Sequence, residues 1–206
     1  TRNAVSPETN APTDWDVKTG RNIRWKADIA SAAFGAPAIA GGLVWIGGNN
    51  WRPGQRELPD AAVLHCFDER TGEKIYEYVS PRLGGSLLTD PSWHGLGSTP
   101  LTEGDRLWFV TNRCETICLD LAPLKQQPRG TPRVVWKVDL REKFGVYSTQ
   151  PIMGPSRLCS IGPSFQGLIF VNTCNGVDQS YKDLPAPKAP ALIAFDQNTG
   201  EAMWQA

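Results

Sequence analysis

The sequence predicts an all-β protein built from repeated four-stranded antiparallel units, and three observations carry this prediction. Glycine and proline are frequent, with 20 Gly and 17 Pro in 206 residues, and this density interrupts any long helix. The apolar runs between turn signals are short, as strands require. Two different patterns also recur along the chain in alternation, which indicates a repeat architecture.

The first recurring pattern is an Asp-x-x-Thr-Gly turn between two apolar strands. It occurs at residues 16–20, 68–72 and 196–200, and a degenerate form has Asp120 followed by an insertion at 121–133. The Asp carboxylate can accept backbone N–H groups inside the turn, and Gly can take the positive φ that closes it. The strand after each turn carries an aromatic residue, and we expect such residues to pack between neighbouring units. The tryptophans expected between units are Trp25, Trp136 and Trp204 in strands that follow such a turn or its degenerate form, and Trp108 in the second strand of a unit.

The second pattern is a proline that precedes a short turn and an apolar run. The prolines are Pro37, Pro100 and Pro163, and successive ones are 63 residues apart. Joined to the first pattern, one unit has a strand, a tight turn, a second strand, a variable loop, a third strand, the Asp-x-x-Thr-Gly turn and a fourth strand. Four antiparallel strands repeated in this way are typical of the blades of a β-propeller.

The repeats place one partial blade and three fuller blades within a single β-propeller domain of residues 1–206. The partial blade is expected at 14–27, and the fuller blades at about 33–79, 97–138 and 158–206. Propellers close with roughly four to eight blades, so we expect a larger ring, completed by more of the polypeptide or by another chain. An open stack exposes apolar faces, so residues 1–206 alone are expected to self-associate or to bind another propeller segment.

The composition excludes several classes of function. Lys plus Arg and Asp plus Glu each number 21, so the formal net charge is zero, which argues against a nucleic-acid or anionic membrane partner. Neither a nucleotide-binding glycine fingerprint nor a Gly-x-Ser-x-Gly nucleophile elbow is present. The uncharged stretch 29–51 is long enough to span a bilayer. Its glycines instead favour two strands joined at Gly41-Gly42, so no transmembrane segment is predicted.

The strand–turn–strand pattern Asp-x-x-Thr-Gly-x-x-x-Trp resembles the repeat of quinoprotein-type propellers. That class includes the alcohol and glucose dehydrogenases that use pyrroloquinoline quinone (PQQ), and the outer-membrane assembly lipoprotein of the same architecture. Segments 12–20, 103–114 and 175–178 are most similar to PQQ-repeat propellers of planctomycetes and related bacteria. The resemblance implies a ring of about seven or eight blades and a location in the periplasm or at the cell surface.

The resemblance leaves PQQ and calcium open as cofactors. Family dehydrogenases stack the quinone between a tryptophan and, in many alcohol-oxidising members, a disulfide of adjacent cysteines. They bind Ca²⁺ through carboxylate and amide oxygens and use an Asp base. This sequence has no adjacent cysteine pair, and the base and the calcium ligands cannot be matched to it residue by residue. Asn175 and Asp178 carry oxygens that suit Ca²⁺, but Asn-Gly is more often a hairpin turn.

The cysteines and histidines predict no metal site. Cys66 and Cys118 each lie two residues before the Asp of the third strand, where Ala194 stands in the last unit, so inert buried thiols are expected. A disulfide remains open among the three cysteines near turns or strand ends, which are Cys114, Cys159 and Cys174. His65 and His94 are too few for a zinc site of the usual type.

The long loops of the units are expected on one face of the propeller, and functional residues are commonly carried by such loops. These loops lie at 49–61, 80–96, 139–157 and 174–190. Their polar residues, expected near the ring axis, are candidate binding residues, and the alternative interpretation of each is a solvated loop residue. The candidates are Arg52, Arg82, Asp90, His94, Asn175, Asp178, Tyr181 and Lys182.

Two functions are consistent with these observations. The first is an extracytoplasmic scaffold that binds a small ligand or a protein partner, or the remainder of the ring, through the loop face. The second is a PQQ- and calcium-dependent dehydrogenase of alcohols or sugars, of which this chain forms about half. A repeat pattern predicts a fold more strongly than it predicts an activity, and catalytic residues are not assigned.

Overall fold

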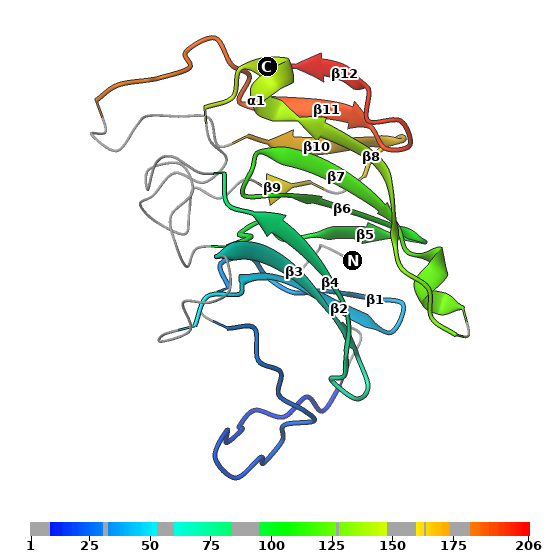
Figure 1. Cartoon of the computed structure of the whole chain (residues 1–206). Helices are drawn as coiled ribbons and strands as arrows, with labels where there is room; N and C mark the ends of the chain where they lie inside the picture. The colour runs from blue at the N-terminus through cyan, green and yellow to red at the C-terminus, as the bar shows by residue number, and fades with distance from the viewer. Residues whose placement is uncertain are drawn as a thin grey trace.

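A computed structural model of the chain describes residues 9–30, 33–52, 60–83, 95–126, 128–147, 160–162, 164–173 and 182–206. Its strands form three antiparallel sheets of four strands each, stacked one beside the next (Figure 1). Two short helices complete the regular structure of these residues. The chain therefore has the predicted all-β architecture of four-stranded antiparallel propeller blades.

Each sheet is a meander in which consecutive strands pair. The first sheet contains β1 (Ala38–Ala40), β2 (Leu43–Asn49), β3 (Ala61–Asp68) and β4 (Lys74–Pro81). The second contains β5 (Leu101–Glu103), β6 (Arg106–Val110), β7 (Glu115–Asp120) and β8 (Arg133–Asp139). The third contains β9 (Ser160–Ile161), β10 (Leu168–Asn172), β11 (Leu192–Asp196) and β12 (Ala202–Gln205). The first strand of each sheet is short and pairs on one side only, so it forms an edge.

The Asp-x-x-Thr-Gly turns form as their chemistry predicts. The Asp68 carboxylate accepts the backbone N–H groups of Arg70 and Thr71 at 3.0 and 2.9 Å. The Asp196 carboxylate accepts the equivalent two groups at 2.9 and 2.8 Å. Gly72 and Gly200 close these turns with φ of 74° and 72°. β3 pairs antiparallel with β4, and β11 with β12, and in each pair the register shifts at the residue before the Asp.

Two apolar cores lie between the sheets. Successive side chains of a strand point to opposite faces, so Leu64 and Cys66 of β3 face the second sheet and pack with Phe109. On its other face, the second sheet presents Cys118 and Trp136 to the third sheet, where Phe195 meets them. Burial from both sides makes the second sheet dependent on its neighbours, as expected for propeller blades.

Two tryptophans anchor the second sheet to the third. Trp136 of β8 donates its indole N–H to the carbonyl of Gln197, inside the 196–200 turn, at 3.0 Å. Its ring lies 6.2 Å from that of Phe195, which is within the range of favourable aromatic pairs. Trp108 of β6 donates to the same Gln197 carbonyl at 3.1 Å. The predicted packing of Trp108 and Trp136 between units is thereby confirmed.

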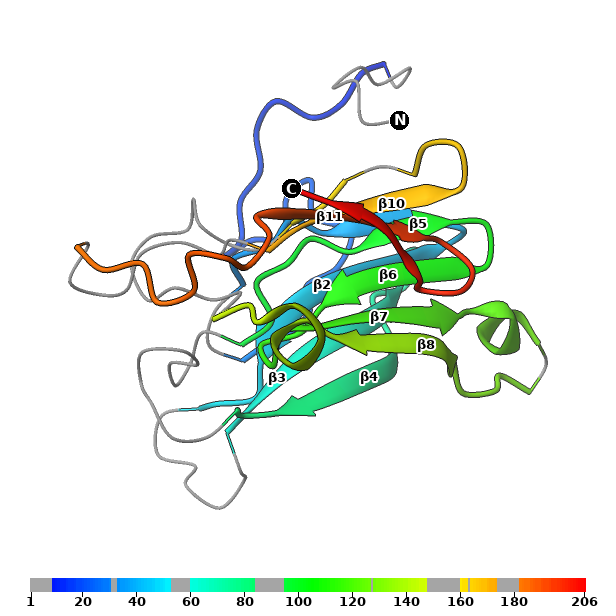
Figure 2. The same cartoon turned by 90° about the horizontal axis from the view of Figure 1, so that it is seen from above.

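The N-terminal segment docks on the outer face of the first sheet in the same manner. Trp25 donates its indole N–H to the carbonyl of Glu69 at 2.8 Å, and its ring lies 6.2 Å from Phe67. Residues 9–30 form the predicted 16–20 turn and an isolated bridge between Asp16 and Arg21, but no strand. The earliest part of the segment, in dark blue, extends beyond the sheets in both views (Figures 1 and 2).

The insertion at 121–133 replaces the turn of the second sheet with a short 3-10 helix, η1 (Ala122–Lys125). Leu121 and Leu124 of this region are buried against the core between the first and second sheets. A second short helix, α1 (Leu140–Phe144), follows β8 and is capped by the Asp139 carboxylate, which accepts the N–H groups of Arg141 and Glu142. No helix among the described residues has the length and apolar composition needed to cross a membrane.

Candidate functional site

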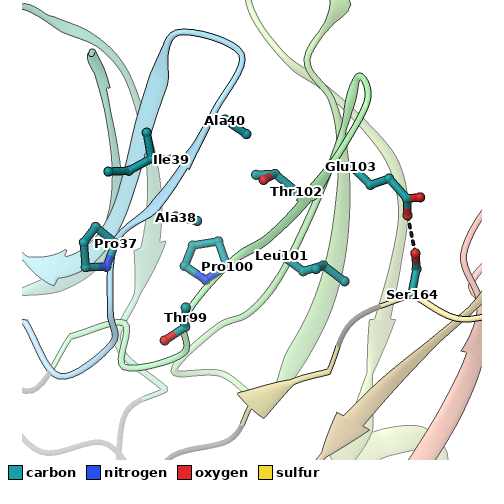
Figure 3. A pocket seen from close by; sticks show the side chains of 10 residues that line it. All are labelled: Pro37, Ala38, Ile39, Ala40, Thr99, Pro100, Leu101, Thr102, Glu103 and Ser164. Atoms are coloured by element: carbon teal, nitrogen blue, oxygen red, sulfur yellow. Dashed lines mark hydrogen bonds between the residues drawn. The ribbon is translucent and has the colours of Figure 1, made fainter. Parts of the chain in front are cut away.

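A groove of about 520 Å³ lies between the inner edges of the first two sheets. We call it the inner-strand groove, and Figure 3 shows its lining side chains. One wall is β1 with the proline before it, the other is β5 with the two residues before it, and one residue of the third sheet's first turn closes it. Its lining residues are Pro37, Ala38, Ile39, Ala40, Thr99, Pro100, Leu101, Thr102, Glu103 and Ser164.

The repeat prolines explain why these residues meet. Pro37 and Pro100 stand directly before β1 and β5, the inner strands, so the repeat brings equivalent positions of two blades face to face. The two approaches are also joined, because the N–H of Ala36 donates to the Thr99 hydroxyl at 2.9 Å. The walls are therefore made of backbone edge and small or apolar side chains.

One end of the groove is polar. Glu103 lies at the end of β5, directly before the tight turn to β6, and its carboxylate accepts a hydrogen bond from the Ser164 hydroxyl (Figure 3). Glu103 is exposed to solvent and is the one ionisable side chain in the lining. The groove therefore combines apolar walls with a single negative charge, which suits binding of an apolar group that carries a cation or a hydrogen-bond donor.

Close backbone packing holds the inner strands in place. Leu96 donates its N–H to the carbonyl of Gly48 at 2.8 Å, so the segment before β5 lies directly on β2. A Cβ on Gly47 would overlap the Leu96 carbonyl, and a Cβ on Gly95 would overlap the Gly48 carbonyl. Glycine is thus required on both sides of this contact, which holds the segment before β5 against β2.

Three of the binding candidates predicted from the long loops lie within the described residues. Arg52 donates to the Asp28 carboxylate at 2.6 Å, which ties the N-terminal segment to the loop after β2. Arg82 lies 3.7 Å from the Asp60 carboxylate, and Lys182 is exposed. The remaining candidates lie outside the described residues, and they are Asp90, His94, Asn175, Asp178 and Tyr181.

Arg82 belongs to a polar group at the loop ends of the first and second sheets. We call this group the loop-face cluster, and it consists of Asp60, Arg82, Arg113, Glu115 and Lys137. Arg113 donates to the Arg82 carbonyl at 3.1 Å, so the cluster crosses from one sheet to the next.

Glu115 is the buried member of the loop-face cluster. Its carboxylate accepts the Lys137 ammonium at 2.9 Å and the Thr111 hydroxyl at 3.3 Å. The hydrogen bond to Glu115 raises the pKa of Lys137. A buried carboxylate is tolerated when it is paired in this way, so the contacts of the cluster are those of a brace between two sheets.

Sequence reasoning missed the inner-strand groove. Glu103 and Ser164 are not among the binding candidates that the sequence patterns predict. The available signal was their place beside the repeat prolines, because the first strand of every blade lines the centre of a propeller. The predicted site on the long-loop face stays a prediction, since most of its candidates lie outside the described residues.

The thiols in the third strands are inert, as predicted. Cys66 and Cys118 are free and fully buried, and burial raises the pKa of each to about 12. The thiolate is the reactive form, so neither is a nucleophile at neutral pH. Cys114 is also buried, whereas Cys159 and Cys174 lie outside the described residues, so a disulfide among these three stays a prediction.

The described residues do not fit a PQQ–calcium centre. No group of three or more His, Cys, Asp or Glu side chains within them could hold a metal ion. The described cysteines, Cys66, Cys114 and Cys118, are buried, and no two of them are adjacent in the sequence. We therefore derive no chemical step through PQQ or calcium.

Comparison with known proteins supports the fold. No family model matches the sequence, and no curated protein matches it. Among solved structures, the quinohemoprotein alcohol dehydrogenase of Comamonas testosteroni matches 86% of this chain with a TM-score of 0.51 and 16% identity. The chain spans 21% of that dehydrogenase, so the similarity shows the propeller fold and leaves activity open.

Two further structures have weaker similarity. The quinohemoprotein alcohol dehydrogenase ADHIIG of Pseudomonas putida HK5 matches 88% of this chain at 14% identity and a TM-score of 0.47, and the match covers 21% of that protein. BamB from Moraxella catarrhalis matches 89% of this chain at 14% identity and a TM-score of 0.43, and the match covers 54% of that protein.

Proposed function

We propose that this chain is part of an extracytoplasmic β-propeller that acts as a binding scaffold, with the inner-strand groove as its ligand site. The groove carries the proposal, because it joins apolar walls from two blades to the single carboxylate of Glu103. Its volume of about 520 Å³ lies within the range of small-molecule sites. One ionisable side chain suits the orientation of a ligand better than it suits acid–base chemistry, which uses partners of different pKa.

The ligand class follows from the lining. An apolar body would lie against Ala38 and Leu101, while an ammonium or hydroxyl group would meet Glu103. Because Glu103 is exposed, its attraction for a cation is screened by water and contributes modestly. Most of the affinity is therefore expected from the apolar contact.

A matched pair of probes tests this site. Phenethylamine and 2-phenylethanol share an apolar body and differ in charge, and their binding is measured by NMR titration. We expect Glu103→Gln to weaken the amine about three- to tenfold and to leave the alcohol unchanged. Glu73→Gln, at an exposed turn on the outer strands, is the control and should change neither. Ala40→Trp fills the groove and should abolish both, and binding of neither probe to the unaltered protein contradicts the proposal.

A PQQ- and calcium-dependent dehydrogenase is the second candidate. The fold similarity to a quinohemoprotein alcohol dehydrogenase favours it, and the absence of a fitting donor set among the described residues does not. The full-length protein should be incubated with PQQ and Ca²⁺, desalted and assayed by dye reduction with alcohols and sugars. We expect no retained quinone absorbance and no turnover, whereas retention with turnover would establish the dehydrogenase.

The location and the ring are proposed on the resemblance of the repeat to quinoprotein-type propellers, including the planctomycete repeat proteins. Such propellers work in the periplasm or at the cell surface, and a ring of about seven or eight blades would enclose the inner strands. Fractionation of native cells tests the location, and recovery of the protein in the cytoplasm would contradict it.

A further inference from the structure

The free edge of β5 runs along the inner-strand groove. Among the described residues, β5 pairs with β6 on one side only, and all three of its residues line the groove. β5 belongs to the middle one of the three sheets, so its edge does not lie at an end of the stack (Figure 1). The edge of a strand offers backbone N–H and C=O groups with which another extended segment can pair.

The tight turn after β5 determines which backbone groups point towards this edge. Glu103 and Arg106 stand opposite each other across a two-residue turn. Such a turn closes with a hydrogen-bonded pair. Hydrogen-bonded and non-hydrogen-bonded pairs alternate along an antiparallel ladder, so the next pair, Thr102 with Leu107, is not hydrogen-bonded. Thr102 therefore directs its backbone N–H and C=O away from β6 and towards the free edge.

The other two sheets have the same kind of turn after their first strand. In the third sheet, Phe165 donates its N–H to the Leu168 carbonyl at 2.9 Å and accepts the Leu168 N–H at 3.0 Å, which is the hydrogen-bonded closing pair. In the first sheet, Ala40 stands directly before a two-residue turn, and Ile39 holds the place that Thr102 has in β5. Both walls of the groove therefore present one backbone N–H and C=O at their free edge.

The side chains of β5 determine what a paired segment would carry. Successive side chains alternate between the two faces of a strand, so Leu101 and Glu103 share one face and flank Thr102. The Glu103 carboxylate is exposed and accepts the Ser164 hydroxyl (Figure 3). Opposite charges on directly opposed residues of neighbouring strands attract, so a basic residue fits opposite Glu103. In β1, Ala40 stands at the equivalent position and offers no charge.

We propose that the inner-strand groove binds an extended peptide that pairs with β5 and carries a lysine or arginine opposite Glu103. This inference rests on the proposed function, because it uses the same groove and the same carboxylate. The central residue of the peptide exchanges two backbone hydrogen bonds with Thr102, and an apolar residue lies opposite Leu101. In the antiparallel direction, which is slightly more stable, the peptide has its basic residue first and its apolar residue third.

N-methylated peptides test the backbone pairing. The probe is acetyl-Lys-Val-Leu-amide, and its binding to the full 206-residue chain is measured by NMR titration. Methylation of the valine nitrogen removes the donor to the Thr102 carbonyl, whereas methylation of the leucine nitrogen removes an N–H that points away from β5. We expect the first change to weaken binding about tenfold and the second to change it less than about twofold. Equal binding of the two methylated peptides overturns the pairing.

A charge variant and hydrogen exchange locate the peptide on β5. Glu103→Gln should weaken the lysine peptide about three- to tenfold and leave a norleucine-Val-Leu peptide unchanged. Glu73→Gln, on the outer strands, is the control and should affect neither peptide. The bound peptide should also slow exchange of the Thr102 amide, because that N–H donates to the valine carbonyl. Unchanged exchange at Thr102, or an equal effect of Glu103→Gln on both peptides, overturns the inference.

Phenethylamine distinguishes failure of the peptide inference from failure of the proposed function. If the amine binds and the peptide does not, the peptide inference is wrong and the groove remains a small-ligand site. If neither binds, both proposals are wrong. Ala40→Trp fills the groove and should abolish peptide binding, with circular dichroism confirming that the variant is folded. Peptide binding that survives Ala40→Trp lies outside the groove and overturns the inference.

Discussion

The contact between the first and second sheets and the contact between the second and third use the same strand positions but different hydrogen bonds. At the second contact, the indoles of Trp108 and Trp136 both donate to the Gln197 carbonyl in an Asp-x-x-Thr-Gly turn. At the first contact, Trp45 takes the place of Trp108, and Tyr76 takes the place of Trp136. The Trp45 indole N–H is fully buried and has no acceptor among the described residues.

The insertion at 121–133 accounts for the difference. It removes the turn that would have offered a carbonyl, and it places Leu121 and Leu124 in the core instead. Arg129 of the same insertion reaches back to the Asp68 carboxylate at 3.3 Å. An insertion can thus supply apolar area and a surface ion pair, but the buried indole without an acceptor costs about 1–3 kcal/mol. Blade packing tolerates this loss because most of its stabilisation comes from apolar burial.

The largest expected loss of stability comes from substituting Gly200, the glycine of the 196–200 turn on which Trp136 packs. Gly200→Ala combines positive φ with a Cβ 2.6 Å from the Trp136 ring, so we expect a loss of about 2–4 kcal/mol in the free energy of unfolding. Gly167→Ala is the matched control, because its φ is 80° and nothing lies within 4 Å of the new Cβ. The control should cost about 1 kcal/mol. Urea denaturation measures both, and equal losses would show that the packing of Trp136 on this turn contributes nothing.

Trp45 and Trp108 are buried at equivalent positions of two second strands. Comparing them measures how much the indole hydrogen bond contributes to stability beyond burial. Trp45→Phe and Trp108→Phe remove similar apolar area from fully buried positions, but only Trp108 donates to a carbonyl. We expect Trp108→Phe to be more destabilising by about 1 kcal/mol, because Trp45→Phe also removes a buried group without an acceptor. Urea midpoints at a constant m-value test this, and a larger loss at Trp45 would contradict the comparison.

The stability of the fold should respond to pH through His65. This side chain is buried beside Phe67, its Nδ1 lies 3.0 Å from the Glu77 carboxylate, and burial lowers its pKa despite that carboxylate. The unfolded chain therefore takes up the proton first, so stability present above about pH 6.5 is lost as the pH falls towards the folded-state pKa. Thermal melts between pH 8 and 5, a range spanning roughly the usual His pKa, should show this loss.

Two variants test whether His65 causes this loss of stability. His65→Phe should flatten the profile between neutral and mildly acidic pH. Lys74, which binds Glu77 at 2.6 Å, also faces this group, and Lys74→Gln should raise the pKa of His65 by removing a positive charge. An unaltered profile in His65→Phe would refute the assignment.

The smallest expected effect is a difference in how readily the contact between the first and second sheets and the contact between the second and third open. Cys66 lies in the core between the first and second sheets, and Cys118 lies in the core between the second and third. Burial raises the pKa of both to about 12, so iodoacetamide should label neither quickly in the folded protein at pH 8. If the missing indole bonds loosen the first contact, peptide mapping should find Cys66 labelled faster than Cys118. Equal rates would show that the insertion compensates fully.

The sequence was a good guide where the deciding chemistry is local. The 68–72 and 196–200 turns form as predicted, because an Asp carboxylate and a glycine with positive φ act within five residues. The sequence did not reveal the inner-strand groove, because the residues of its walls are far apart in sequence and become neighbours only when two sheets stack.

By itself, then, the sequence determined the strands, the turns and the repeat, including the tryptophans that would lie between blades. The tertiary structure alone decided which carbonyl receives each indole, and that Trp45 would receive none. The physical reason is distance along the chain. A turn is closed by atoms a few residues apart, whereas Trp108 and Gln197 meet only after apolar burial has brought two independent sheets together. At the other contact, the thirteen-residue insertion at 121–133 replaces the turn, and the Trp45 indole has no acceptor among the described residues.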